Sequence, residues 1–106
     1  MLRNVCANNI IDMKIAKNSR QMERHFKGIA NHWRVDILLA VAKNDGITLD
    51  HISDATDCNI KATSEHARRL TQAGLLTKKY IGRNVAHSLS PYGKIFVAFI
   101  KTFSHS

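Results

Sequence analysis

Long polar side chains that could bind an anion or the edge of a base lie close together in residues 59–72. On a helical wheel of about 100° per residue, residues 60–74 separate into two sides. The side expected to pack on a core holds Ile60, Thr63, Ala67, Leu70 and Gly74. The opposite, polar side holds Lys61, Glu65, Arg68, Arg69 and Gln72. Side chains of these polar types can reach phosphates and base edges, so this segment is a candidate nucleic-acid contact.

The position of each side chain on this helix predicts its role. The candidate DNA-binding residues of the segment are Asn59, Lys61, Ser64, Glu65, Arg68, Arg69 and Gln72. Of these, Lys61, Ser64 and Glu65 lie near the start of the helix and are expected to touch bases. The Glu65 carboxylate could accept a hydrogen bond from a cytosine amino group. Arg68, Arg69 and Gln72 are expected to bind phosphates. The alternative is a helix face that is merely solvated.

A basic hairpin is predicted to follow this helix. Residues 75–80 and 85–89 have the composition of strands, and the turn 81–84 contains Gly82. Three basic side chains lie on or beside the hairpin: Lys78, Lys79 and Arg83. An arginine at a protruding tip suits a narrow, electronegative minor groove. The alternative is a charged edge that prevents sheets from aggregating.

The distribution of charge favours an anionic partner. The 106 residues carry a net charge of +8. Residues 1–58 hold eight basic and seven acidic side chains, whereas residues 59–106 hold eight basic ones and a single acid, Glu65. Because the basic residues of the second part fall on successive elements, one shared polyanionic partner explains them better than separate solvated faces.

The first half of the chain is predicted to be helical. Apolar residues recur at helical spacing within 10–30, which indicates one or two amphipathic helices. Asn31 is a suitable N-cap for a further helix, which the residues 44–46 (Asn-Asp-Gly) would end. Thr48 can cap a short helix that ends by Asp57.

The second half completes the order of elements. A helix is predicted from about Ile60 to Ala73, closed by Gly74, and the hairpin follows. Ser90-Pro91 is a favourable helix start, because proline at the first position lacks only an N–H that would be unpaired anyway. The predicted fold is therefore mainly α with a small β-hairpin, in the order helix, helix, helix, turn, helix, hairpin, helix.

Two local motifs resemble those of known DNA-binding proteins. Residues 64–75, Ser-Glu-His-Ala-Arg-Arg-Leu-Thr-Gln-Ala-Gly-Leu, resemble the ArsR pattern S-x-H-hydrophobic-x-x-L-x-x-A-G-L. Residues 89–94, Leu-Ser-Pro-Tyr-Gly-Lys, resemble the L-T/S-P-x-G-K segment that closes the wing in related regulators. The stretch from about Trp33 to Lys94 thus resembles the winged helix-turn-helix transcriptional regulators of the ArsR and MarR type.

The resemblance implies a sequence-specific regulator of transcription, most simply a repressor, that binds double-stranded DNA as a homodimer. The recognition helix, about 60–73, would enter the major groove, and the wing, 77–88, would contact the backbone or minor groove. We expect a single domain over 1–106. Its parts are a frayed start (1–9), an N-terminal helical dimerisation segment (10–30), a winged-helix core (31–90) and a C-terminal helix (91–103).

The apolar residues of the terminal segments are candidates for the dimer interface. The C-terminal stripe consists of Ile95, Phe96, Phe99, Ile100 and Phe103. The N-terminal set consists of Ile11, Ile15, Met22 and Phe26. Such a small domain rarely needs so much apolar surface on a terminal helix, so pairing with a second copy would bury the surplus. The resemblance implies the same arrangement; the alternative is a helix folded wholly into its own core.

No metal or other cofactor is expected. Sensors of this type carry paired cysteines in the helix that corresponds to residues 49–56, where this chain has none. His51 and Asp54 could meet on one face, but two exposed ligands make a weak site. Cys58 lies at a turn position and is interpreted as a core residue. Whether a small-molecule effector exists stays open.

Other classes of protein are disfavoured by the sequence. It contains no phosphate-binding glycine loop and no nucleophile motif, which argues against an enzyme. It shows no secretory signal or apolar stretch long enough to span a bilayer, and its two cysteines suit a reducing compartment. A cytoplasmic protein, on the nucleoid when DNA is bound, is expected. The main competing hypothesis is a winged-helix module that binds another protein and no specific DNA.

Overall fold

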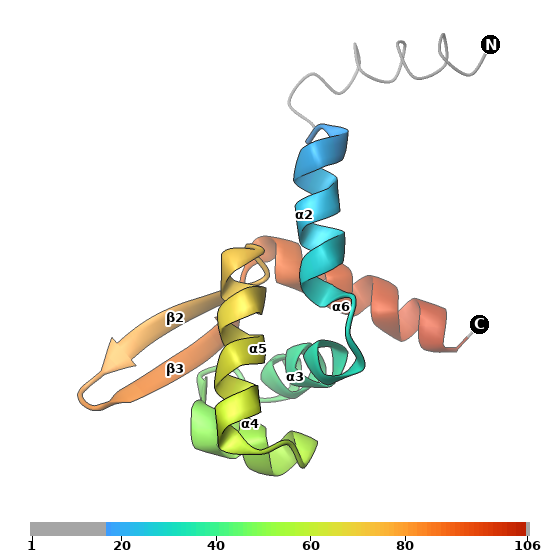
Figure 1. Ribbon diagram of the computed structural model, residues 1–106. Coiled ribbons are helices and arrows are strands. Elements are labelled where there is room, and N and C mark those ends of the chain that lie inside the picture. The colour runs from blue at the N-terminus through green and yellow to red at the C-terminus, as the bar shows by residue number, and fades with distance from the viewer. Residues whose placement is uncertain (1–16, 106) are drawn as a thin grey trace, which may run out of the picture.

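The computed structural model describes residues 17–105 and consists of a cluster of helices with a small sheet, whose β-hairpin projects to one side (Figure 1). In chain order its elements are α2 (Ser19–Ile29), α3 (His32–Lys43), β1 (Ile47–Thr48), α4 (Leu49–Thr56), α5 (Ile60–Gln72), β2 (Leu76–Ile81), β3 (Asn84–Leu89) and α6 (Pro91–Ser104). The expectations for residues 1–9, Ile11 and Ile15 lie outside the described residues.

The core forms where α3, α4, α5 and the base of the hairpin meet. Its members are apolar side chains with at most 7% of their surface exposed, among them Ile37, Leu38, Val41, Ile47, Ile52, Leu70, Leu75, Leu76 and Val97. Helix α3 supplies the first three and lies at the centre of the assembly. Burial of these branched side chains supplies most of the free energy that holds α5 in place.

Asn31 and Ser90 form the N-cap hydrogen bonds that are expected of them, and Asn59, which is not predicted as a cap, forms one too. The Asn31 side chain accepts from the backbone N–H groups of Trp33 and Arg34, and the Asn59 side chain accepts from that of Ala62. Ser90 Oγ accepts from the Gly93 N–H (2.9 Å). Thr48 occupies the N-cap position of α4, but its side chain does not cap; its Oγ1 lies 3.1 Å from His51 Nδ1 instead.

The hairpin is part of a three-stranded antiparallel sheet with strand order β1-β3-β2. In β2 and β3, Ile81 pairs with Asn84, so Gly82 and Arg83 form a two-residue turn. Gly82 has a φ of +62°, the left-handed backbone that glycine adopts without strain at the first position of such a turn. Strand β1 was not expected; its two residues pair with Ala86 and His87 of β3.

One expectation about burial is wrong. Ile60 was assigned to the core side of its helix but is 45% exposed, because a wheel gives direction around the axis and not how far neighbouring elements extend along it. Phe96 and Ile100, which remain predictions for the dimer interface, are partly buried against the chain's own core. Val97 of the same helix is 5% exposed, so α6 turns this side inward.

Candidate nucleic-acid interface

A short turn fixes the position of α5 relative to α4. Asp57 ends α4 in the left-handed conformation (φ 55°, ψ 39°), and Asn59 begins α5. Between them Cys58 is 6% exposed, which agrees with its interpretation as a core residue. The Cys58 carbonyl accepts hydrogen bonds from the hydroxyls of Ser53 and Thr63, so both helices hold the turn. The two helices therefore meet at a defined angle.

Helix α5 presents one side to the core and another to solvent. Thr63, Ala67 and Leu70 are at most 1% exposed, as the helical wheel predicts. The exposed residues of α5 include Lys61, Ser64, Arg68, Arg69 and Gln72. Asn59 is exposed as well, although its side-chain oxygen is engaged in the cap. The polar side chains singled out from the sequence thus lie together on one surface of the helix.

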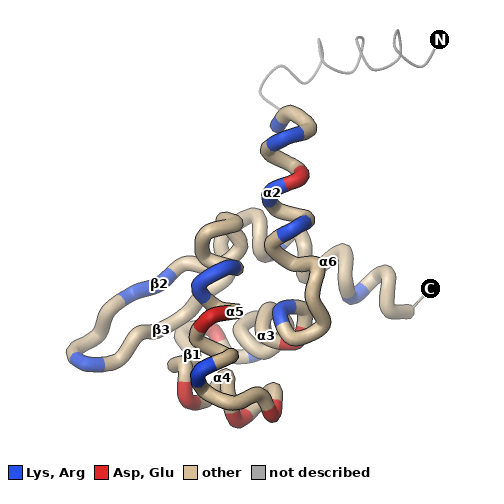
Figure 2. Tube along the Cα trace, viewed as in Figure 1, with Lys and Arg blue, Asp and Glu red and all other residues tan. Residues whose placement is uncertain are grey.

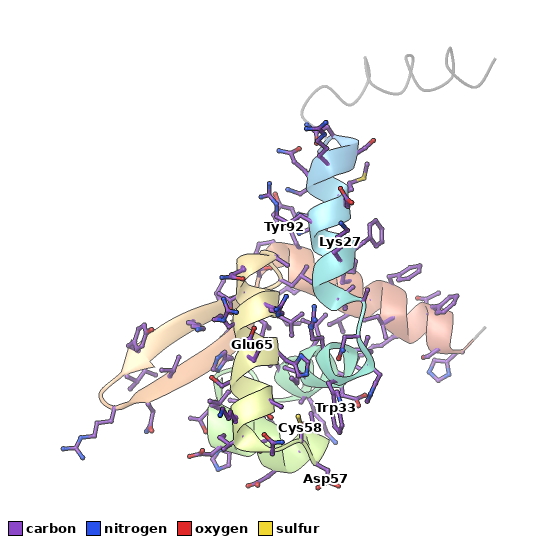
Figure 3. All side chains as sticks on the ribbon, in the orientation of Figure 1. Lys27, Trp33, Asp57, Cys58, Glu65 and Tyr92 are labelled. Atoms are coloured by element: carbon purple, nitrogen blue, oxygen red, sulfur yellow. The ribbon has the colours of Figure 1, made fainter. Side chains whose placement is uncertain are left out.

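Glu65 binds both arginines of this surface (Figure 3 labels Glu65). Arg68 donates from Nε to Glu65 Oε1 (3.1 Å) and from Nη2 to Oε2 (2.6 Å). Arg69 donates from Nε to the same Oε2 (3.0 Å). Hydrogen bonds from the two guanidinium groups hold the pKa of the Glu65 carboxyl below its ordinary value, and the same carboxylate raises the pKa of Arg68.

A second contact joins α5 to the preceding helices. Arg34 donates from Nε to His66 Nδ1 (3.3 Å) and from Nη1 to the carbonyl oxygens of Lys27 (3.3 Å) and Gly28 (3.0 Å). Burial lowers the pKa of His66, and the charges of Arg34 and Arg69 lower it further. The sequence analysis missed this link, which ties the end of α2 and the start of α3 to the middle of α5.

The β2–β3 hairpin extends away from the helices (Figure 1) and carries the second group of basic side chains. Lys78, Lys79 and Arg83 are exposed, and Arg83 lies in the turn at the tip. Between the hairpin, the start of α4 and the middle of α5 is a cleft of about 270 Å³. Ser64 of α5 and Lys78 of the hairpin both line this cleft.

The hairpin also exposes two large apolar residues that the sequence analysis did not single out. Tyr80 is 73% exposed and Ile81 58% exposed, beside the turn. The sequence could have predicted this exposure from the hairpin itself, because a hairpin that projects from the core has no element to cover either face of its outer half.

Charge is distributed unevenly over the described surface. Figure 2 shows acidic residues gathered on and around α4, while lysines and arginines lie on α5 and along the hairpin. The exposed acids of the α4 region include Asp50, Asp54 and Asp57. An anion approaching this side of the molecule is therefore directed away from α4 and toward α5 and the hairpin.

Comparison with known proteins identifies the architecture. No protein-family model matches the chain, and no curated protein does. Among solved structures, HlyU from Vibrio cholerae has a TM-score of 0.76 at 23% identity, covering 85% of this chain and 98% of that one. The homodimeric winged helix-turn-helix DNA-binding domain Mb0332 from Mycobacterium bovis has a TM-score of 0.72 at 21% identity, over 85% and 89%. A predicted DNA-binding transcriptional regulator from E. coli has a TM-score of 0.72 at 20% identity, over 80% and 90%. The fold is a winged helix-turn-helix.

In the terms of this fold, α4 and α5 form the helix-turn-helix, α5 is its second helix, and β2 and β3 form the wing. The fold class predicted from the sequence is confirmed. The helix predicted at 60–73 is found at Ile60–Gln72, and the strands of the wing begin and end within one residue of the predicted positions.

A separate apolar surface lies on α2 and α6. Its most exposed members come from α2 and α6: Met22 (43%), Phe26 (57%), Ile95 (64%), Phe99 (58%) and Phe103 (67%). The rings of Phe99 and Phe103 stack at 5.6 Å, and Phe26 meets the edge of Phe96 at 5.4 Å. We call these five exposed residues the α2–α6 apolar face. Five of the seven described residues expected at a dimer interface therefore lie on it.

Residues 17–105 hold neither a metal-binding cluster nor a membrane-spanning helix. This part of the chain contains no group of three or more His, Cys, Asp or Glu side chains arranged to hold a metal ion. None of its helices is long and apolar enough to cross a membrane.

Proposed function

We propose that this chain is a sequence-specific, double-stranded DNA-binding regulator of transcription, most simply a repressor. The observation that carries the proposal is the exposed polar surface of α5, with a projecting basic wing beside it. An α-helix fits the width of the major groove, and the wing is placed to reach the adjacent backbone or minor groove. The similarity in fold to Mb0332, a DNA-binding domain, and to a MarR family transcription regulator supports it.

The residues assigned to DNA are those expected from the sequence. Lys61, Ser64 and Glu65 contact bases, because they lie in the first half of α5, where a recognition helix approaches the groove. Arg68, Arg69 and Gln72 bind phosphates, as do Lys78 and Lys79 of the wing. Arg83 reaches the minor groove from the tip of the wing, and Asn59 contributes from the start of α5.

The regulator acts as a homodimer whose two copies pair through their α2–α6 apolar faces. A symmetric dimer places two recognition helices on one side of the duplex, so the operator is a pseudo-palindrome. The description of Mb0332 as homodimeric supports this assembly. The protein works in the cytoplasm, on the nucleoid when DNA is bound.

The α2–α6 apolar face also favours one other function, a winged-helix module that docks another protein. In that case the face binds a partner of a different kind, and the chain alone is a monomer that binds duplex DNA weakly at any sequence. The two functions therefore differ in oligomeric state and in DNA affinity.

Removal of the two arginines tests the assignment of α5. The double variant Arg68→Ala/Arg69→Ala should bind duplex DNA at least about 100-fold more weakly at moderate salt, because each arginine loses a charge-assisted contact with a phosphate. Fluorescence anisotropy with labelled duplexes measures the loss, and circular dichroism confirms that the variant is folded.

The matched control removes two positive charges elsewhere. Lys43→Ala/Lys101→Ala changes exposed residues in the last turns of α3 and α6, so the net charge falls equally. Its affinity should fall only a few-fold. Equal losses in the two double variants would show that α5 has no special role.

A further inference from the structure

Glu65 is the single acidic residue between positions 59 and 106, and it lies on the surface assigned to DNA. Its carboxylate occupies the Nε and Nη2 hydrogens of Arg68 and the Nε hydrogen of Arg69. The side chains remain open to solvent, with exposed fractions of 45% for Glu65, 48% for Arg68 and 54% for Arg69. Both arginines proposed to bind phosphates are therefore already bound within the free protein.

The order of the three residues along α5 matters for what DNA meets first. Glu65 precedes Arg68 by three positions and Arg69 by four, about one helical turn nearer the start of the helix. A helix that enters the groove by its N-terminal half brings this carboxylate closer to the bases than the arginines. When a phosphate binds Arg68 and Arg69 in place of Glu65, the Glu65 carboxylate remains beside the phosphate as a second anion. It then lacks the arginine donors that had neutralised it.

We propose that Glu65 is a specificity-determining residue that competes with DNA phosphates for Arg68 and Arg69. At a random sequence the Glu65 carboxylate stays hydrogen-bonded to the arginines and neutralises part of their charge, so the protein binds DNA more weakly. At the operator a cytosine amino group donates to the carboxylate and replaces the arginines, which then bind phosphates fully. The inference rests on the proposed DNA-binding function and assigns to Glu65 a role in discrimination as well as in contact.

The test compares wild-type protein with Glu65→Gln, which keeps the size of the side chain and removes its charge. Affinities are measured for a random duplex pool and for the duplex that selection with wild-type protein enriches. We expect Glu65→Gln to bind the random pool about fivefold to tenfold more tightly, since two exposed ion pairs no longer compete. The ratio of operator to random affinity should fall at least about tenfold.

The dependence on salt gives a second readout that a purely structural role would not change. If the carboxylate withholds the arginines, its removal adds phosphate contacts at random sequence. The slope of log affinity against log salt concentration for the random pool should then steepen by about one to two.

The matched control is Glu23→Gln on α2. Glu23 forms another acid–base pair on a helix surface, with Lys27 at 2.9 Å, and its removal changes the net charge equally. Its affinity for random DNA should change less than about twofold.

Random-pool binding by Glu65→Gln that is unchanged or weaker would overturn the inference, because Glu65 would then only position the arginines. An equally large increase in the affinity of Glu23→Gln for the random pool would also overturn the inference, because the change in net charge alone would then explain the tighter binding. Failure of wild-type protein to bind any duplex would overturn the proposed function itself, and the inference with it.

Discussion

Two imidazoles, buried His87 and half-buried His66, are predicted to make the stability of this protein depend on pH. His87 is 2% exposed, and its Nδ1–H donates to the Ile47 carbonyl oxygen at 3.4 Å. Burial lowers the pKa of His87, and the charge of Lys78 lowers it further, against the opposing hydrogen bonds to the backbone of Ile47 and Val85. The pKa of His66 is lowered as well, by burial and by Arg34. At these two positions the unfolded chain therefore binds protons more readily than the folded one.

The free energy of unfolding should consequently fall as the pH is lowered through about 6.5, the ordinary pKa of histidine. Below this pH the unfolded chain takes up protons at His66 and His87 that the folded chain, with its lowered pKa values, does not. Urea unfolding between about pH 7.5 and about pH 5.5 measures this fall. In His87→Gln, whose amide can still donate to Ile47, the fall should be smaller than in wild-type protein. Equal falls in the two proteins would show that His87 does not contribute.

The composition of the candidate DNA surface could be predicted from the sequence, but its internal bonding could not. Helical spacing is sufficient to place Arg68, Arg69 and Glu65 on one side of α5. The same spacing allows contacts at i+3 and at i+4. Which of them form is decided by side-chain rotamers and by neighbours, and the contact between Arg34 and His66 joins residues 32 positions apart.

At the scale of elements, close packing of α2 on the end of α5 depends on one small residue. A Cβ atom added at Gly28 would lie 2.2 Å from the Ala73 Cβ, far inside van der Waals contact. Gly28→Ala should therefore destabilise the protein by about 1–3 kcal/mol, the range for overpacking in a well-packed site. Urea or thermal unfolding of wild type and variant measures the difference.

The chain offers an internal control for this prediction. In Gly28→Ala/Ala73→Gly the added methyl meets no opposing Cβ, so much of the stability should return. A single variant as stable as wild type, or a double variant less stable than the single one, would contradict the packing argument.

Most helices could be predicted from the sequence because their ends carry local chemical signals. Asn31 and Ser90 cap the helices that they are expected to cap, while the Asn59 cap of α5 was not predicted. Gly28 is the counterexample. A glycine near a helix end weakens the prediction of that helix, and the reason for a glycine at this position is its close contact with Ala73 at the end of α5. Strand β1 was missed because two residues show no alternation, and it exists only by pairing with β3, about 40 positions away.

The whole molecule is predicted to be a dimer in solution. Each side chain of the α2–α6 apolar face is at least 43% exposed in the protomer, and a second copy can cover the face symmetrically. Phe99→Glu/Phe103→Glu places two charges on this face, at positions more than half exposed in the protomer, so the fold should survive while dimers dissociate. Light scattering measures the mass, and affinity for a two-site operator should drop by at least about 100-fold with the loss of bivalent binding.

Ile81→Glu is the matched control for the mass measurement, since Ile81 is equally exposed but lies on the wing. It should remain dimeric. A monomeric wild-type protein would contradict the dimer and favour the module that docks another protein.

The position of the dimer face could be predicted only in part. An unbroken apolar stripe on α6 suggested one surface, whereas the structure divides it, with Phe96 and Ile100 turned toward the core and Ile95, Phe99 and Phe103 toward solvent. An apolar residue in the sequence predicts that its side chain is buried. It does not predict whether the same chain or another chain buries it.

Sequence-specific binding of duplex DNA is the central claim, and one measurement tests it most directly. Purified protein is titrated against a random duplex library by fluorescence anisotropy over a series of salt concentrations, and the bound fraction is sequenced. We predict a steep loss of affinity with rising salt, because phosphate contacts release condensed counterions, together with enrichment of a pseudo-palindromic motif. Weak binding that hardly changes with salt, and no enriched motif, would contradict the claim.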